Sequence, residues 1–127
     1  MKAITAEWVK KAEGDFATME RESRARKNPN YDAVCFHGQQ CVEKYLKARL
    51  CAAGIAFPKT HDLPALLNMV ITEEPIWEAY RKDFSFLTDF GASFRYPGES
   101  ADKNMANEVL KICRRFRKIA RSSAWFK

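Results

Sequence analysis

Apolar residues recur every three to four positions along most of the chain, which is the repeat of an amphipathic helix. The longest such stretch is 31–54, YDAVCFHGQQCVEKYLKARLCAAG. Apolar residues cover much of its circumference, so we expect a central helix with neighbours on most sides. Its main apolar stripe consists of Val34, Cys41, Tyr45, Ala48 and Ala52. Gly54 is expected to end this helix, because glycine readily adopts the left-handed conformation found after a helix C-terminus.

The segment before the central helix predicts a first helix from about Thr5, which is expected to cap it, to about Arg24. Gly14 inside this helix is expected to mark a close approach of another helix. After the central helix, a short helix is predicted over about 63–71. Thr60 or Asp62 is expected to cap it, since both residue types accept hydrogen bonds from free backbone N–H groups.

A fourth helix is predicted from Glu74-Pro75 to about Gly91, and a last helix follows an expected cap at Ser100. The inner face of the fourth helix is predicted to hold Trp77, Tyr80, Phe84, Leu87 and Phe90. The inner face of the last helix is predicted to hold Met105, Val109, Ile112, Cys113, Phe116 and Ile119. No segment shows the alternation of a strand. The fold class is therefore all-α, an up-down bundle of four long helices plus one short helix, in a single domain over 1–127.

The charge of the chain is positive and unevenly placed. Its 127 residues carry 22 Lys and Arg against 16 Asp and Glu, a net charge of +6. Segment 111–127 alone holds seven bases and no acid. Such a cluster can contact the phosphates of a nucleic acid, but cations near a helix C-terminus also stabilise the helix dipole without any ligand. Both interpretations stay open at this point.

Several classes of protein are disfavoured by what the sequence lacks. No apolar run is long enough for a membrane span or a signal peptide, so a cytoplasmic protein is expected. The four cysteines form no C-x-x-C pair and the two histidines have no ligand-like spacing, so we expect neither a metal nor another cofactor. No glycine-rich phosphate loop and no nucleophile elbow is present.

A second, polar stripe on the central helix is the leading candidate for a ligand site. It consists of His37, Gln40, Lys44 and Lys47, with Glu43 beside it. Arg95 and Tyr96, in the connector before the last helix, are predicted to join it. Lysine and arginine suit phosphate, and tyrosine can stack on a base. The alternative is a solvated face on which Glu43 pairs with Lys47 at i,i+4, with Arg95 as a structural clamp.

Thr60, His61 and Asp62 form a possible extension of this site. A free imidazole titrates near neutral pH, which makes His61 a candidate acid or base. The structural interpretation, a helix cap with a hydrogen-bonded histidine, is favoured over a catalytic one. His37 is likewise favoured as a histidine whose hydrogen bonds are satisfied within the core or at an interface.

Three motifs resemble the HEPN domain family (higher eukaryotes and prokaryotes nucleotide-binding). They are the string HGQQCVEKYLKA at 37–48, the string FPKTHDL at 57–63, and Arg95-Tyr96-Pro97 before the last helix. They occur in the expected order, and the resemblance covers about 5–120. It implies a bundle of four to five helices and a homodimer, commonly encoded beside a minimal nucleotidyltransferase in a pair of the toxin–antitoxin kind. In that picture the helical protein binds or positions a nucleotide.

Many HEPN proteins are RNA-cleaving toxins with an Arg, four to six residues, and then a His. This chain departs from that motif, because no histidine follows Arg95 and no arginine precedes His37 or His61 by five to seven residues. The resemblance therefore implies a non-catalytic HEPN protein that binds a nucleotide or serves as a nucleotidyltransferase partner. Two alternatives remain: an RNase with a variant site around Arg95 and His61, or an interaction module whose basic last helix, Trp125 and Phe126 hold a protein or RNA.

Overall fold

The computed structural model describes residues 1–91 and 97–127, and these residues form helices and connections with no strand among them. The long helices are α1 (Ala3–Ser23), α2 (Tyr31–Ala52) and α5 (Lys103–Ser122). Between α2 and α5 lie α3 (Leu63–Val70) and α4 (Arg81–Thr88). The predicted all-α class is confirmed.

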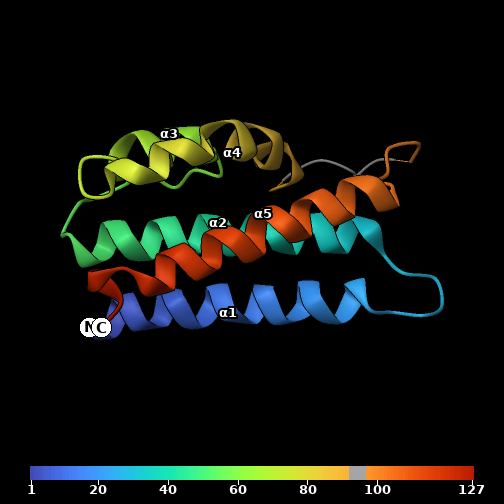
Figure 1. Cartoon of the computed structure of the whole chain (residues 1–127), viewed down its shortest axis with the longest axis horizontal. Coiled ribbons are helices and arrows are strands. Elements are labelled where there is room, and N and C mark those ends of the chain that lie inside the picture. Colours follow the sequence, from blue (N-terminus) through green and yellow to red (C-terminus); the bar gives the residue numbers. More distant parts are fainter. Residues whose placement is uncertain (92–96) are drawn as a thin grey trace.

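The helices pack as a bundle around α2, as its sequence pattern predicted (Figure 1). In Figure 1, α1 covers one side of α2, α3 and α4 lie on the opposite side, and α5 crosses in front. The chain of α1 runs antiparallel to both α2 and α5. Thirteen of the 22 residues of α2 are buried, which places its polar side chains against other helices.

Close approach of α2 and α5 depends on Gly38. A Cβ atom at this position would lie 2.3 Å from Val109 Cγ1, so no larger residue fits without a shift of the helices. The prediction for Gly14 is wrong, because a Cβ there would have no neighbour within 4 Å. Gly54 has φ +72° directly after the C-cap of α2, as predicted.

Two of the expected helix caps differ from the sequence prediction. Thr5 does not cap α1; it is buried inside the helix and donates a hydrogen bond to Cys51 Sγ at 3.2 Å. The last helix is capped by Asp102, whose side chain accepts from the Met105 backbone N–H, whereas Ser100 lies before the cap. Asp62 caps α3, as one of the two alternatives predicted.

The segment predicted as a continuous fourth helix is divided into three pieces. A 3-10 helix over Pro75–Tyr80 precedes α4, and a second one over Asp89–Gly91 follows it. Short 3-10 turns are common at helix ends, and here they let Trp77 and Phe90 both reach the core. The centroid of the Trp77 ring lies 5.0 Å from that of Phe116 on α5.

Most residues of the predicted core faces are buried, Ala52, Tyr80 and Ile119 are half-buried, and one residue is exposed. Met105 is 37% exposed, and the neighbouring Ala106 is buried in its place, because α5 turns its 105 position outward. The four cysteines are free, three of them buried, and burial raises the pKa of the Cys35 thiol to about 12. No helix among the described residues is long and apolar enough to cross a membrane.

Candidate functional site

Two members of the polar stripe on α2 bind the same residue of α1. His37 Nδ1 lies 2.8 Å from Asp15 Oδ1, and Lys44 Nζ lies 2.5 Å from Asp15 Oδ2. The Asp15 side chain is only 10% exposed. Both side chains therefore hold α1 against α2 through Asp15. His37 has its hydrogen-bond partner within the protein, as predicted.

The other charged member of the stripe, Lys47, is buried together with Glu43. Lys47 Nζ lies 3.1 Å from Glu43 Oε2, so the predicted i,i+4 pair forms. The side chains are 8% and 3% exposed, however, and the interpretation of this part as a solvated face is wrong. Lys47 Nζ also lies 5.6 Å from the centroid of the Trp8 ring, an arrangement in which the ring stabilises the cation.

A chain of side-chain amides continues from this pair. Gln40 donates to Gln39 Oε1 at 2.7 Å, and Gln39 donates to Glu43 Oε1 and to the carbonyl of His61, both at 3.2 Å. Gly91 makes room for this chain, because a Cβ there would lie 2.9 Å from Gln39 Cδ. Gln39 is fully buried and joins the helix to loop 53–62.

His61 closes the network at the surface. Its Nδ1 lies 2.9 Å from Glu43 Oε1, while its side chain is 66% exposed. Thr88 donates to the His61 carbonyl at 3.0 Å, and Thr60 Oγ1 accepts from the Asp62 backbone N–H at 3.1 Å. The three residues of the predicted extension are thus held in a defined turn, in which His61 and Asp62 are exposed and Thr60 is half-buried.

The structure brings together His61, Glu43, Lys47 and Gln40 in one network, and places His37 and Lys44 in a separate one with Asp15. Arg95 and Tyr96 lie outside the described residues. Whether they reach the stripe stays a prediction.

Carboxylates of α1 and arginines of α5 form a second set of charged contacts. Arg117 donates to both oxygens of Glu13, at 2.8 and 2.6 Å, and Tyr45 donates to the same carboxylate. Burial acts to raise the pKa of Glu13, but the bonds from Arg117 and Tyr45 outweigh it, so the pKa lies below its usual value. Burial, together with the bond to Glu13, raises the pKa of Tyr45.

A second clamp joins Glu20, seven residues after Glu13 on α1, to Arg114, three residues before Arg117 on α5. Arg114 donates to both oxygens of Glu20, at 2.6 and 2.7 Å. These bonds lower the pKa of Glu20 and raise that of Arg114. Bidentate pairs of this kind fix the plane of the guanidinium group as well as its position.

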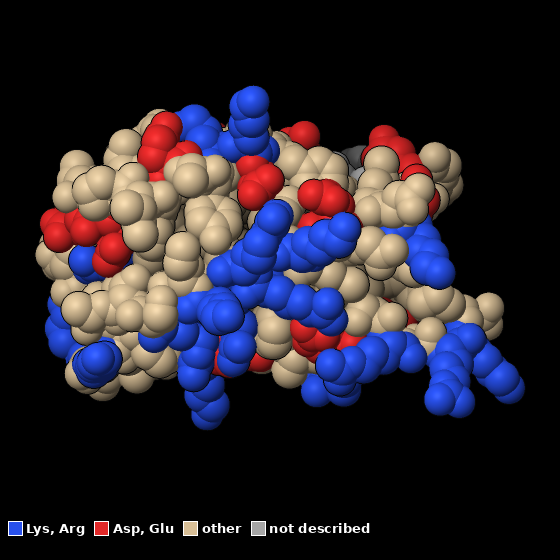
Figure 2. Space-filling view, in the orientation of Figure 1, with Lys and Arg blue, Asp and Glu red and all other residues tan. Residues whose placement is uncertain are grey.

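These clamps lie within a strongly basic face. Figure 2 shows Lys and Arg side chains gathered across the middle of the molecule, over α5 and the adjoining part of α1. A groove of about 460 Å³ lies in this region. Its lining consists of Phe16, Arg114, Arg117, Lys118, Arg121 and Ser122.

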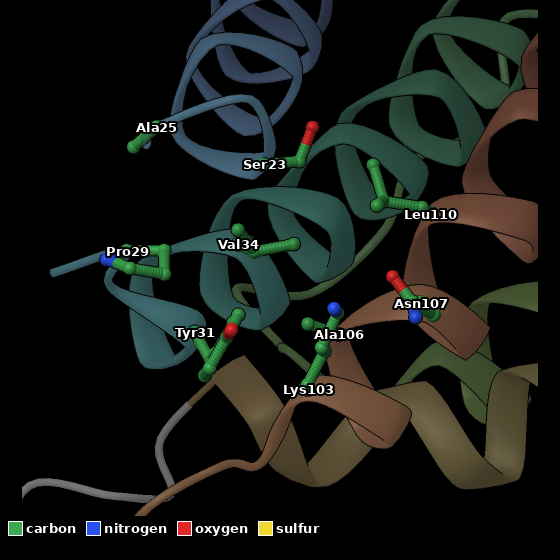
Figure 3. A pocket seen from close by; sticks show the side chains of 9 residues that line it. All are labelled: Ser23, Ala25, Pro29, Tyr31, Val34, Lys103, Ala106, Asn107 and Leu110. Carbon is green, nitrogen blue, oxygen red and sulfur yellow. The ribbon is translucent and has the colours of Figure 1, made fainter. Parts of the chain in front are cut away.

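A hollow of about 140 Å³ lies at the other end of α5, where the end of α1, the start of α2 and the start of α5 meet (Figure 3). Val34, Ala106 and Leu110 supply buried apolar lining. Tyr31, Lys103 and Asn107 supply a hydroxyl, a cation and an amide. None of these three polar groups forms a hydrogen bond or ion pair with another described residue.

A second hollow, of about 360 Å³, adjoins the first, and Pro29 and Tyr31 line both. None of the residues that line either hollow was predicted from the sequence as part of a ligand site. The sequence offers one weak signal there, the turn residues Asn28-Pro29-Asn30, and in the structure Asn28 adopts φ +47°. No cluster of three or more potential metal ligands occurs among the described residues.

Comparison with known proteins gives one match. The sequence model of the HEPN domain matches residues 5–123, nearly the whole chain. This chain belongs to the HEPN domain family. The match confirms the family resemblance of the three motifs, and the helical fold agrees with it. No curated protein and no solved structure shows significant similarity to this HEPN protein.

Proposed function

We propose that this HEPN protein is non-catalytic and forms a cytoplasmic homodimer that binds a nucleotide or serves as the partner of a minimal nucleotidyltransferase. Its family supports nucleotide or RNA chemistry in general. The absence of a histidine five to seven positions after Arg95 supports the non-catalytic part.

The observation that carries the nucleotide proposal is the hollow around Tyr31, Lys103 and Asn107. The Tyr31 ring can stack on a base, the Lys103 ammonium group can bind a phosphate, and the Asn107 amide can form hydrogen bonds with the edge of a base. Apolar lining with a few free polar groups is typical of small-molecule sites, which have volumes of about 300–1,000 Å³. The hollow of about 140 Å³ is smaller than this, so a nucleotide would also occupy the adjoining hollow of about 360 Å³. By contrast, a phosphate at Lys44 or Lys47 would have to compete with Asp15 or Glu43.

Calorimetric titration with ATP, GTP, CTP and UTP, with and without magnesium, tests this proposal. Saturable binding is expected, weakened about tenfold by Lys103→Gln and by Asn107→Ala, since each removes one contact. Lys44→Gln and Arg95→Ala report on the predicted stripe in the same way. If only Lys44→Gln and Arg95→Ala abolish binding, the nucleotide site is on the polar stripe and not in the hollow. If no nucleotide produces heat, nucleotide binding is contradicted.

The homodimer is tested separately by sedimentation equilibrium. A mass of twice 14.6 kDa is expected at tens of micromolar protein. A monomer under these conditions would contradict the dimer and leave the nucleotide result standing. Co-purification with a nucleotidyltransferase encoded beside this chain tests the partner proposal.

RNA cleavage is the second candidate function, and one observation favours it. Glu43 orients a solvent-facing imidazole, His61, through a contact of 2.9 Å, the arrangement in which a carboxylate supports a general base. Incubation of RNA with the protein and with His61→Asn tests this candidate, with His37→Asn as the matched control. Cleavage lost only in His61→Asn would support an RNase, and intact RNA after long incubation would exclude it.

A further inference from the structure

The basic groove beside α5 has residues of its own, separate from those of both candidate nucleotide sites. Its lining comes from α5 and from Phe16 of α1. The described part of the chain places no carboxylate in this lining; Glu13 and Glu20 lie behind it, bound to arginines. A polyanion entering the groove would therefore meet cations first.

Three cations on the exposed side of α5 are the least engaged groups in this region. Lys111, Arg115 and Lys118 recur at steps of four and three residues and share one face of the helix. Lys111 and Lys118 are exposed and have no ion pair with a described residue. The contact recorded for Arg115 is long, 3.9 Å to Asp83. Seven residues of helix span about 10 Å, so the row is long enough to follow several phosphates of one strand.

The clamped arginines add fixed donors beside this row. Arg114 and Arg117 each bind a glutamate through Nε and one terminal nitrogen, which leaves the second terminal nitrogen without a hydrogen bond to a described residue. Because Glu20 and Glu13 hold these side chains in place, a ligand would not need to order them.

Aromatic rings lie under two of the guanidinium groups. Arg117 Cζ lies 4.4 Å from the centroid of Phe16, and Arg121 Cζ lies 4.5 Å from that of Phe126. Layers of guanidinium and aromatic ring are flat surfaces on which a nucleic-acid base can stack. An acidic polypeptide would use the cations of the groove but not these flat surfaces.

We propose that this groove binds a single strand of nucleic acid, with the α5 cations on its phosphates and the arginine–aromatic layers against its bases. This docking site goes beyond the proposed nucleotide binding and does not depend on it. The two are separable by variants, since the hollow and the groove share no residue.

Fluorescence anisotropy with a labelled 12-nucleotide RNA, at several salt concentrations, is the test. For about three phosphate contacts, log Kobs should fall against log salt with a slope of about −2, because each contact to a single strand contributes about 0.7. DNA of the same sequence should bind within about threefold, because the groove recognises phosphates and base faces. A strict requirement for the 2′-hydroxyl would contradict this mode of recognition.

The double variant Lys111→Gln/Lys118→Gln tests the location. Loss of two contacts should weaken binding about 25-fold at 0.1 M salt and reduce the slope to about −0.7. Lys27→Gln/Lys59→Gln removes the same charge from two exposed loop positions and should change binding less than about threefold. All four lysines are exposed, so circular dichroism should show an unchanged fold for both variants.

Three outcomes would overturn the proposal: no saturable binding at 50 mM salt, an equal loss in the two double variants, or complete displacement of the RNA by polyglutamate of the same charge. The last outcome would identify the groove as a site for an acidic protein. Nucleotide titration of the Lys111→Gln/Lys118→Gln variant should match that of the wild type, so a failure here is distinct from a failure of the nucleotide proposal.

Discussion

The polar stripe of α2 and the basic face of α5 both look like ligand sites in the sequence, but their charged groups are used differently. On α2, Lys44 and Lys47 are each bound to a largely buried carboxylate. On α5, Lys111 and Lys118 face solvent and pair with no described residue. The difference arises because α2 is enclosed by other helices, whereas α5 has an exposed side.

A stripe of polar residues at helical spacing therefore does not reveal whether its charged groups are free or already paired within the protein. On a central helix, the cost of burying a charge favours an internal partner. On a peripheral helix, the same residue types can stay hydrated. Substitutions in the two regions should therefore differ in what they change: stability in the first, binding in the second.

The largest effect is expected for Glu43→Ala. This change leaves buried Lys47 without its counter-charge and removes the contacts from Gln39 and His61. Loss of one partner of a buried pair costs about 3–5 kcal/mol of unfolding free energy. Urea denaturation measures it. A loss below about 1 kcal/mol would mean that the network contributes little to stability, and that α2 does not differ from α5 in this respect.

Gly91→Ala should follow, with a loss of about 1–3 kcal/mol from overpacking. The new Cβ would press on the Gln39 amide, at 2.9 Å from its Cδ, and disturb the hydrogen bonds of that side chain. Gly14→Ala is the matched control: nothing lies within 4 Å there, and alanine favours the helix by up to about 1 kcal/mol. Thermal denaturation of the pair should show shifts of opposite sign.

A third prediction concerns the clamps and acid. The pKa values of Glu13 and Glu20 are lowered in the folded state, so their contribution is present above the unfolded pKa, near 4.5, and is lost as pH falls through the folded values. Glu13→Gln should cost about 1–2 kcal/mol at pH 7 and much less at pH 3. Denaturation at several pH values measures this difference. Glu7→Gln, at an exposed position that forms no ion pair with a described residue, should show no such trend.

The smallest effect on stability is expected for Lys118→Gln, within about 0.5 kcal/mol, because the side chain is exposed and pairs with no described residue. In the same variant, affinity for single-stranded RNA should fall about fivefold at 0.1 M salt. A stability loss above about 1 kcal/mol would show that α5 uses this cation internally, as α2 uses Lys47. The contrast between the two helices would then disappear.

The fold follows from the sequence because each long helix has an apolar face at the right spacing. The central position of α2 was predictable from apolar residues such as Val34 and Leu46 around its circumference. The 3-10 turns at Pro75–Tyr80 were not, since they arise where Trp77 must reach Phe116 across the bundle. Asp102, rather than Ser100, is the cap because α5 begins at Lys103, and the preceding Ala101 N–H is bound to Asp32 of α2.

The candidate sites were only partly predictable, because contacts between residues far apart in the sequence determine which side chains meet. Sequence spacing gives the pair of Glu43 with Lys47, but not the partnership of Lys44 with Asp15, 29 positions away. The hollow at Tyr31 and Asn107 depends on how the ends of three helices meet, which no local pattern contains.

The clamps that Glu13 and Glu20 form with α5 also have a kinetic consequence. A nucleic-acid strand that reaches the groove would find Arg114 and Arg117 already in one conformation, so no slow rearrangement of these side chains would follow the encounter. Capture should then be governed by diffusion and by long-range attraction, with an association rate constant that falls steeply as salt is added. The residence time would instead depend on the short-range contacts, above all those with the two arginine–aromatic layers.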